Sequence, residues 1–187
     1  MDEVQIDAWN CWVEEQARDM QEYIQSSWPM KGCAQFTLGK IHCSWSRSRR
    51  SSRGGLYKID GIWQPGINIS MNGYIPRYGE IRHYEYKSFD KNKFIGGFYT
   101  DNMEHPLLAV VAHEVAHAIQ RWVEYYDRLK ASKPHGKEFK DYYAQLRAVY
   151  VNPLLPNQEK MKKTYEELNA VITREIKTQS VEKVLIQ

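Results

Sequence analysis

Long apolar runs are absent from this 187-residue chain. The mean hydropathy is −0.67, and no stretch approaches the roughly 18 apolar residues that a membrane helix requires. The first residues contain neither a basic segment nor an apolar one, so no signal peptide and no membrane association are expected.

Cysteine is also scarce. The chain has three cysteines, an odd number, and none of them forms a CxxC pair: Cys11, Cys33 and Cys43. This argues against a disulfide framework and excludes a zinc ribbon, which needs two such pairs. We therefore expect three reduced, mostly buried thiols in a reducing, cytoplasmic compartment.

The composition that remains is globular, with 42% hydrophobic and 26% charged residues. The net charge of +3 hides an uneven distribution. Residues 1–30 carry seven acidic side chains and one basic one, whereas residues 31–60 carry seven basic side chains and one acidic one. An acidic block followed by a basic block is a pattern that needs an explanation.

Periodicity divides the chain into helical and extended parts. Apolar residues recur every three or four positions in four segments, which we predict to be helices: residues 4–28, 106–130, 137–150 and about 157–186. Between residues 35 and 90 the period is two, with Asp-Gly, Pro-Gly and Asn-Gly turns between short runs, which is typical of antiparallel strands. The predicted fold class is α+β, a small antiparallel sheet packed with an N-terminal helix and the helix at 106–130, followed by C-terminal helices.

The helix predicted at 106–130 contains an HExxH motif, His113-Glu114-Val115-Ala116-His117. Residues four apart share one helix face, so the two imidazoles can bind one metal ion. The glutamate can reach a water on that metal and act as its general base. The motif therefore predicts a hydrolytic zinc site with Glu114 as the catalytic residue.

A catalytic zinc needs a third protein ligand and an open fourth position. The downstream candidates are His135, Glu124, Glu138 and Asp141. Chemistry alone favours His135, because a turn at Pro134-His135-Gly136 would fold the next helix back toward the site. The other histidines, His42, His83 and His105, are expected to be ordinary strand or loop residues.

These residues resemble the SprT-like metallopeptidase family, which includes the Spartan proteases. HExxH followed by His135-Gly136 and Phe139 is similar to the family's pattern, as are Ser44-Trp45-Ser46, Arg53-Gly54-Gly55-Leu56 and Ile67-Asn68-Ile69-Ser70 upstream. The resemblance implies a zincin-like fold and zinc bound by His113, His117 and His135.

The resemblance covers about residues 5–150, and we expect residues 1–150 to form the metallopeptidase domain. Residues 74–104 look like an insertion, and residues 151–187 like a C-terminal helical extension. No cysteine follows Cys43, so the C-terminal zinc ribbon found in many family members is not expected. A compact form of this kind with an added helix would suit a phage protein or a small bacterial protein.

The basic block is a candidate surface for single-stranded or damaged DNA, because arginines neutralise phosphates and aromatic rings stack on bases. Its members are Lys40, Trp45, Arg47, Arg49, Arg50, Arg53 and Lys58. The alternative is a solvated hairpin turn, or one paired with the acidic first helix. Because Spartan-type enzymes cleave DNA-crosslinked proteins, the resemblance favours contact with DNA and a role in DNA repair.

The sequence thus predicts a monomeric zinc metalloprotease that acts on a protein substrate associated with DNA. Two alternatives stay open: a metalloprotease of a specific protein target without DNA dependence, and a non-enzymatic nucleic-acid-binding protein braced by a metal.

Overall fold

The computed structural model describes residues 2–46, 51–71, 81–86, 89, 92, 94–167 and 170. Its elements follow the chain in this order: α1 (Glu3–Ser27), α2 (Lys31–Ala34), β1 (Lys40–Ser44), β2 (Arg53–Ile59), β3 (Ile62–Ser70), β4 (Ile81–His83), β5 (Phe98–Thr100), α3 (Glu104–Tyr126) and α4 (Lys137–Leu146). A π-helical turn at Arg147–Val151 and a 3₁₀ turn at Asn152–Leu154 continue α4, and residues 158–167 are helical. The predicted α+β fold class is confirmed.

The first helix forms as its sequence predicts. The Asp2 side chain accepts a hydrogen bond from the Gln5 backbone, and the Gln5 side chain accepts one from Asp2, which makes a capping box. The predicted apolar stripe becomes the buried face, and each fully buried aliphatic side chain contributes roughly 1.5–3 kcal/mol. The buried members are Val13, Ala17, Met20, Ile24 and Trp28.

The main sheet has three strands in the order β1-β3-β2. β2 and β3 form an antiparallel hairpin closed by Asp60 and Gly61, both with positive φ, as the Asp-Gly signal predicts. β1 instead runs parallel to β3, so the prediction of an antiparallel sheet is wrong for this strand. β3 inserts between β1 and β2, and two reversals of direction leave β1 and β3 pointing the same way.

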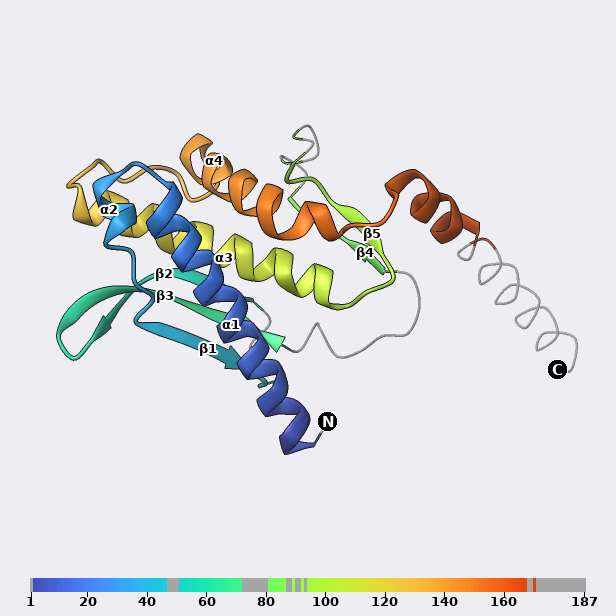
Figure 1. Ribbon diagram of the computed structural model, residues 1–187, viewed down its shortest axis with the longest axis horizontal. Helices are drawn as coiled ribbons and strands as arrows, with labels where there is room; N and C mark the ends of the chain where they lie inside the picture. The colour runs from blue at the N-terminus through green and yellow to red at the C-terminus, as the bar shows by residue number, and fades with distance from the viewer. Residues whose placement is uncertain are drawn as a thin grey trace, which may run out of the picture.

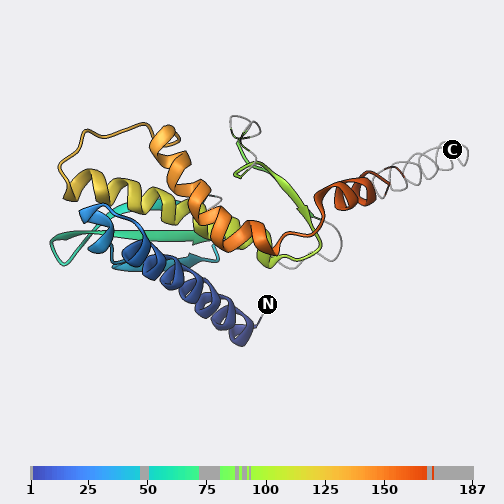
Figure 2. The ribbon, with the colours of Figure 1, turned by 45° about the horizontal axis from the view of Figure 1, so that its top comes forward.

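The helices α1 and α3 cover one face of this sheet. Gly54, Ile67 and Ile41 stand in register across the three strands, and successive strand residues point to opposite faces. A Cβ on Gly54 would meet α3, and Ile67 is fully buried, so this is the inner face. Figures 1 and 2 show the two helices against the sheet, with α4 running beside α3.

The second sheet is a hairpin that lies apart from the first. β4 pairs with β5 in antiparallel register, from Ile81 opposite Thr100 to His83 opposite Phe98. β4 falls within residues 35–90, where short strands are predicted, but β5 was not predicted. Both ribbon views place this hairpin near the end of α4 rather than beside the main sheet (Figures 1 and 2).

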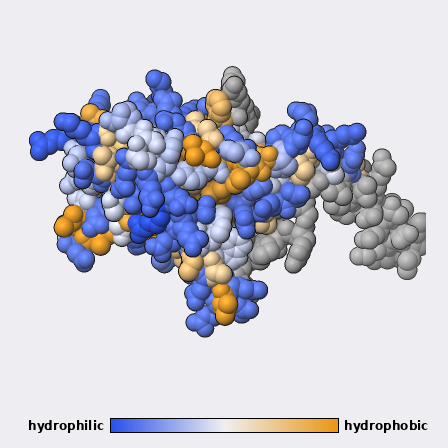
Figure 3. Space-filling view, viewed as in Figure 1, coloured by the Kyte–Doolittle hydropathy of each residue, from blue (hydrophilic) through white to orange (hydrophobic). Residues whose placement is uncertain are grey.

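Among the helices of the described residues, none combines the length and the apolar character needed to cross a membrane. Figure 3 shows a mostly hydrophilic face with separate hydrophobic patches, one of them at the β2–β3 turn. Ile62 and Trp63 of that turn are 64% and 46% exposed. Scattered apolar surface of this kind is common on globular proteins.

The three cysteines are unpaired, as predicted. Cys33 is buried and Cys43 is partly buried, and burial raises the pKa of both thiols to about 11. Cys11 on α1 is exposed, which differs from the expected burial because it lies outside the apolar stripe of that helix.

Candidate metal centre

The HExxH residues lie in the buried middle of α3, as the helix prediction requires. His113 and Glu114 are 8% and 7% exposed, and His117 is partly buried one turn further on. The alanines at 112, 116 and 118 are fully buried around them. Small side chains here let the sheet and α4 approach the helix closely enough to enclose the two imidazoles.

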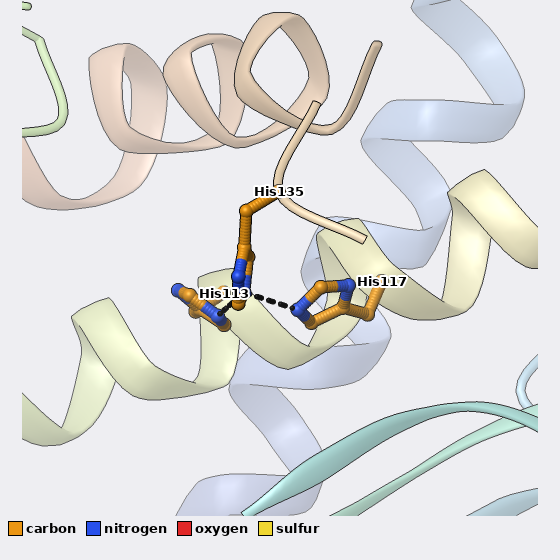
Figure 4. A group of neighbouring side chains, drawn as sticks. All are labelled: His113, His117 and His135. Atoms are coloured by element: carbon orange, nitrogen blue, oxygen red, sulfur yellow. Dashed lines mark hydrogen bonds between the residues drawn. The ribbon is translucent and has the colours of Figure 1, made fainter. Parts of the chain in front are cut away.

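His135 completes a group of three histidines. It lies in the loop before α4, and Figure 4 shows its ring directed at the two histidines of α3. Its Nε2 is 3.0 Å from Nε2 of His117 and 3.3 Å from Nε2 of His113. One ligand nitrogen from each ring lies within 4.8 Å of the others.

The loop that carries His135 is anchored by the second half of α3. Gln120 donates hydrogen bonds to Ser132 Oγ at 2.6 Å and to the Lys133 carbonyl at 3.1 Å. Glu124 accepts hydrogen bonds from the backbone N–H and the hydroxyl of Ser132. Burial alone would raise the pKa of Glu124, but these bonds and Arg121 outweigh it and lower that pKa.

These contacts show where each predicted third ligand lies. Glu124 is engaged with Ser132 and Arg121 rather than with the histidines. Glu138 and Asp141 are exposed on α4, and neither belongs to the histidine group. The structure therefore brings His135, and not the three carboxylates, to the two HExxH histidines.

The geometry of the three nitrogens fits a metal ion. A tetrahedral ion with bonds of about 2.0–2.1 Å separates its ligand nitrogens by about 3.3 Å, close to the 3.0 and 3.3 Å observed. A neutral imidazole carries one N–H, so three facing nitrogens cannot all be satisfied by hydrogen bonds among themselves. A cation bound between them satisfies all three lone pairs at once.

The electrostatic environment keeps the three rings neutral, which is the form that binds metals. Burial lowers the pKa of His113 well below its usual value, and the neighbouring histidines lower it further. Burial and His135 lower the pKa of His117 to about 4. Burial also lowers the pKa of His135.

A pH dependence of the metal-free protein follows. A histidine with a depressed pKa stabilises the fold above about 6.5, and this contribution is lost as the pH falls toward 4 because the unfolded chain takes up the proton first. Glu114, whose pKa is raised to about 7, has the opposite effect on stability between pH 4.5 and about pH 7. It is a single group, whereas three histidines have lowered pKa values. Chelator-treated protein should therefore unfold at a lower temperature at pH 5 than at pH 7.

The matched variant for that measurement is His117→Gln, which removes one titrating ring. Its unfolding temperature should change less between pH 7 and pH 5 than that of the unsubstituted protein. Equal changes in the two proteins would show that His117 does not contribute to the acid sensitivity.

Glu114 is held against the edge strand β2. The backbone N–H of Gly54 donates to its carboxyl group. Burial raises the pKa of Glu114 to about 7, and the charge of Glu85 adds to the rise, whereas the Gly54 hydrogen bond and the charge of Arg53 oppose it. A carboxyl group with a pKa near neutrality is suited to take up and release protons at physiological pH.

Gly54 permits the close approach of β2 and α3. A Cβ at this position would lie 1.8 Å from the carbonyl oxygen of Glu114 and 3.0 Å from its Cα. Since these are backbone atoms, Gly54→Ala should force β2 away from α3 and cost about 1–3 kcal/mol of stability, as overpacking does. Lys58→Ala, at an exposed position of the same strand, should leave the denaturant midpoint nearly unchanged; equal losses in both variants would contradict this explanation.

Aromatic rings surround the histidines. Phe139 of α4 stacks on His117 with ring centres 4.2 Å apart, and Tyr86 lies 4.3 Å from the His135 ring. Phe89 is fully buried and contacts His113 and Phe139. Phe139 is part of the predicted motif, but Tyr86 and Phe89 were missed, because nothing in their sequence spacing connects them to the HExxH helix.

The predicted DNA-binding residues separate into groups. Arg47, Arg49 and Arg50 lie outside the described residues. Lys40 pairs in register with Gly66, and Gly66 pairs with Gly55. Arg53 lies two residues before Gly55 on β2, so its side chain points to the same face of the sheet as that of Lys40. This is the outer face, opposite α1 and α3. The Lys40 ammonium lies 5.2 Å from the centre of the Tyr57 ring on this face.

Lys58 and Trp45 do not join that surface. Lys58 is four residues from Gly54 along β2, so its side chain points to the inner-face side. Trp45 follows β1 and donates from its indole nitrogen to Asn10 of α1 at 2.9 Å. The Trp45 ring is thus packed on the first helix.

A helix-borne HExxH with a third histidine from the following loop, on an α+β fold, defines a metal centre of the metallopeptidase type. The chain belongs to the SprT-like family, whose family model matches residues 31–164. This confirms the predicted resemblance and places the chain among zincin-like, metal-dependent proteins. Comparisons with curated proteins and with solved structures found no match.

Proposed function

We propose that this protein is a zinc-dependent metalloprotease that hydrolyses peptide bonds. The observation that carries the proposal is the convergence of the His113, His117 and His135 Nε2 atoms beside the buried Glu114. When bound there, zinc lowers the pKa of a coordinated water toward 7 and polarises the scissile carbonyl.

The chain's own residues perform the remaining steps. Glu114 accepts the proton of the attacking water and passes it to the leaving amine, which balances the hydrolysis. The Gly54 N–H favours the charged form of the Glu114 carboxyl group. β2 is an edge strand, and an extended substrate backbone can align along such an edge.

The direct test is cleavage of an unfolded protein substrate by the full chain. Cleavage should require zinc, stop after chelation and return when zinc is restored. A zinc-loaded chain that cleaves none of a broad panel of unfolded and DNA-bound proteins would contradict the proposal.

We further propose that the substrate is a DNA-associated or DNA-crosslinked protein. Arg53 supports this, because it directly precedes Gly54 and its charge acts on Glu114. DNA bound along Lys40 and Arg53 would lie on the face of the sheet opposite α3, and Arg53 is the member of this pair whose charge reaches Glu114. Arg47, Arg49 and Arg50 are included in this proposal on the basis of the sequence alone. We also propose a reducing, cytoplasmic location, which the unpaired cysteines favour.

Two lysines on opposite faces of the sheet test the DNA contact. Lys40→Ala should weaken single-stranded DNA binding and reduce its salt dependence by about one phosphate contact, whereas Lys58→Ala should not. Adding DNA should then increase cleavage less in Lys40→Ala than in Lys58→Ala. Cleavage that does not respond to DNA in the unsubstituted chain would favour a metalloprotease without DNA dependence.

A further inference from the structure

The side chain of Glu85 is a buried carboxylate outside the HExxH motif. It follows β4, contacts Tyr143 of α4 and is only 6% exposed. A buried carboxylate is costly unless charged or hydrogen-bonding partners surround it. Its partners therefore indicate what it does.

One oxygen of Glu85 binds groups that hold it in place. Oε1 accepts a hydrogen bond from the Tyr143 hydroxyl, lies 3.1 Å from His83 Nε2 and lies 3.6 Å from the Arg147 guanidinium. The Arg147 side chain is 2% exposed and also donates to Tyr143 and Asn152. These contacts join the β4–β5 hairpin to α4 and the π-helical turn.

The other oxygen faces the metal centre. Oε2 lies 3.9 Å from Nδ1 of the neutral His113 ring. The opposite nitrogen of the same ring, Nε2, faces His135. The two nitrogens of an imidazole play different roles, and an acceptor beside one of them sets which one carries the proton.

We propose that Glu85 is a positioning residue of the metal centre, holding the His113 ring with its proton on Nδ1 and its Nε2 lone pair directed between His117 and His135. A carboxylate behind a ligating histidine fixes the ring and makes it a stronger ligand. The role rests on the metal centre of the proposed function. It also gives Glu85, which lies in the predicted insertion at residues 74–104, a share in building that centre.

The test is the zinc affinity of Glu85→Gln in the full chain, measured by competition with a chromophoric chelator. Glutamine keeps the shape of the side chain and loses its charge. The affinity should fall about 10- to 100-fold, the usual cost of removing such a partner. Zinc affinity equal to that of the unsubstituted chain would overturn the proposal.

Glu85→Gln also leaves the buried Arg147 without its counter-charge, which can loosen the fold by itself. The double variant Glu85→Gln/Arg147→Met removes both charges, and the thermal unfolding of each metal-free variant reports its stability. If Glu85 positions His113, the double variant still binds zinc weakly although its stability recovers. Recovery of the zinc affinity together with the stability would overturn the proposal.

The outcome is separable from that of the proposed function, because zinc affinity is measured without a substrate. A chain that binds zinc tightly and cleaves nothing contradicts the protease, while the comparison of Glu85 variants still decides the positioning role.

Discussion

Glu114→Gln should lower peptide-bond cleavage by about 10²- to 10⁴-fold, the usual contribution of a general base, while the zinc content stays at about one ion per chain. The amide has the shape of the carboxylate and can still accept the Gly54 hydrogen bond, but it cannot take a proton from water. Glu114 does not belong to the group of side chains that could hold the metal, which consists of three histidines. Metal binding should therefore survive the substitution. Cleavage rate and metal content of the same sample measure both.

The matched control is Glu104→Gln, an exposed glutamate in the first turn of the same helix. It should cleave at the unsubstituted rate. Unchanged cleavage in Glu114→Gln would remove the proposed general base. An unsubstituted chain that binds zinc and DNA but cleaves nothing would favour the non-enzymatic alternative, a nucleic-acid-binding protein braced by its metal.

His135→Ala should lose about one zinc per chain and with it all measurable cleavage. Two imidazoles from one helix are too few for a tightly held catalytic zinc, which takes three protein ligands. Metal analysis after dialysis against a weak chelator measures the loss. His42→Ala is the control, because His42 lies on the outer face of the sheet against Asn68 and should keep its zinc.

If the His135→Ala variant retained zinc and cleavage, the third protein ligand would have to be one of the carboxylates. Glu124 would then be the next candidate, since it is the one on the same helix as His113 and His117. That result would require Glu124 to leave Ser132 and Arg121, whose hydrogen bonds it accepts in the structure.

The helix that carries HExxH was predictable because two independent signals coincide. The apolar stripe of residues 106–130 predicts a helix, and the helix observed is Glu104–Tyr126. HExxH then places both histidines on one face by spacing alone. His135 was harder to predict because it lies in a loop, where no periodicity fixes the position of a side chain. Chemistry alone favours it over the carboxylates, and the resemblance to a family strengthens that choice.

The parts that sequence could not supply depend on contacts between distant segments. Gln120 and Ser132 hold the His135 loop, yet each residue looks ordinary in its own segment. Glu85 meets His113 from a hairpin that pairs with an unpredicted strand. The parallel pairing of β1 with β3 likewise follows from strand order, which alternation within a strand does not encode.

X-ray absorption of the zinc-loaded chain at the zinc edge tests the three-histidine centre most directly. The account predicts imidazole scattering from three rings, with nitrogen or oxygen ligands at about 2.0–2.1 Å and no sulfur at about 2.3 Å. Two imidazoles or fewer, or a sulfur ligand from Cys11, Cys33 or Cys43, would contradict it.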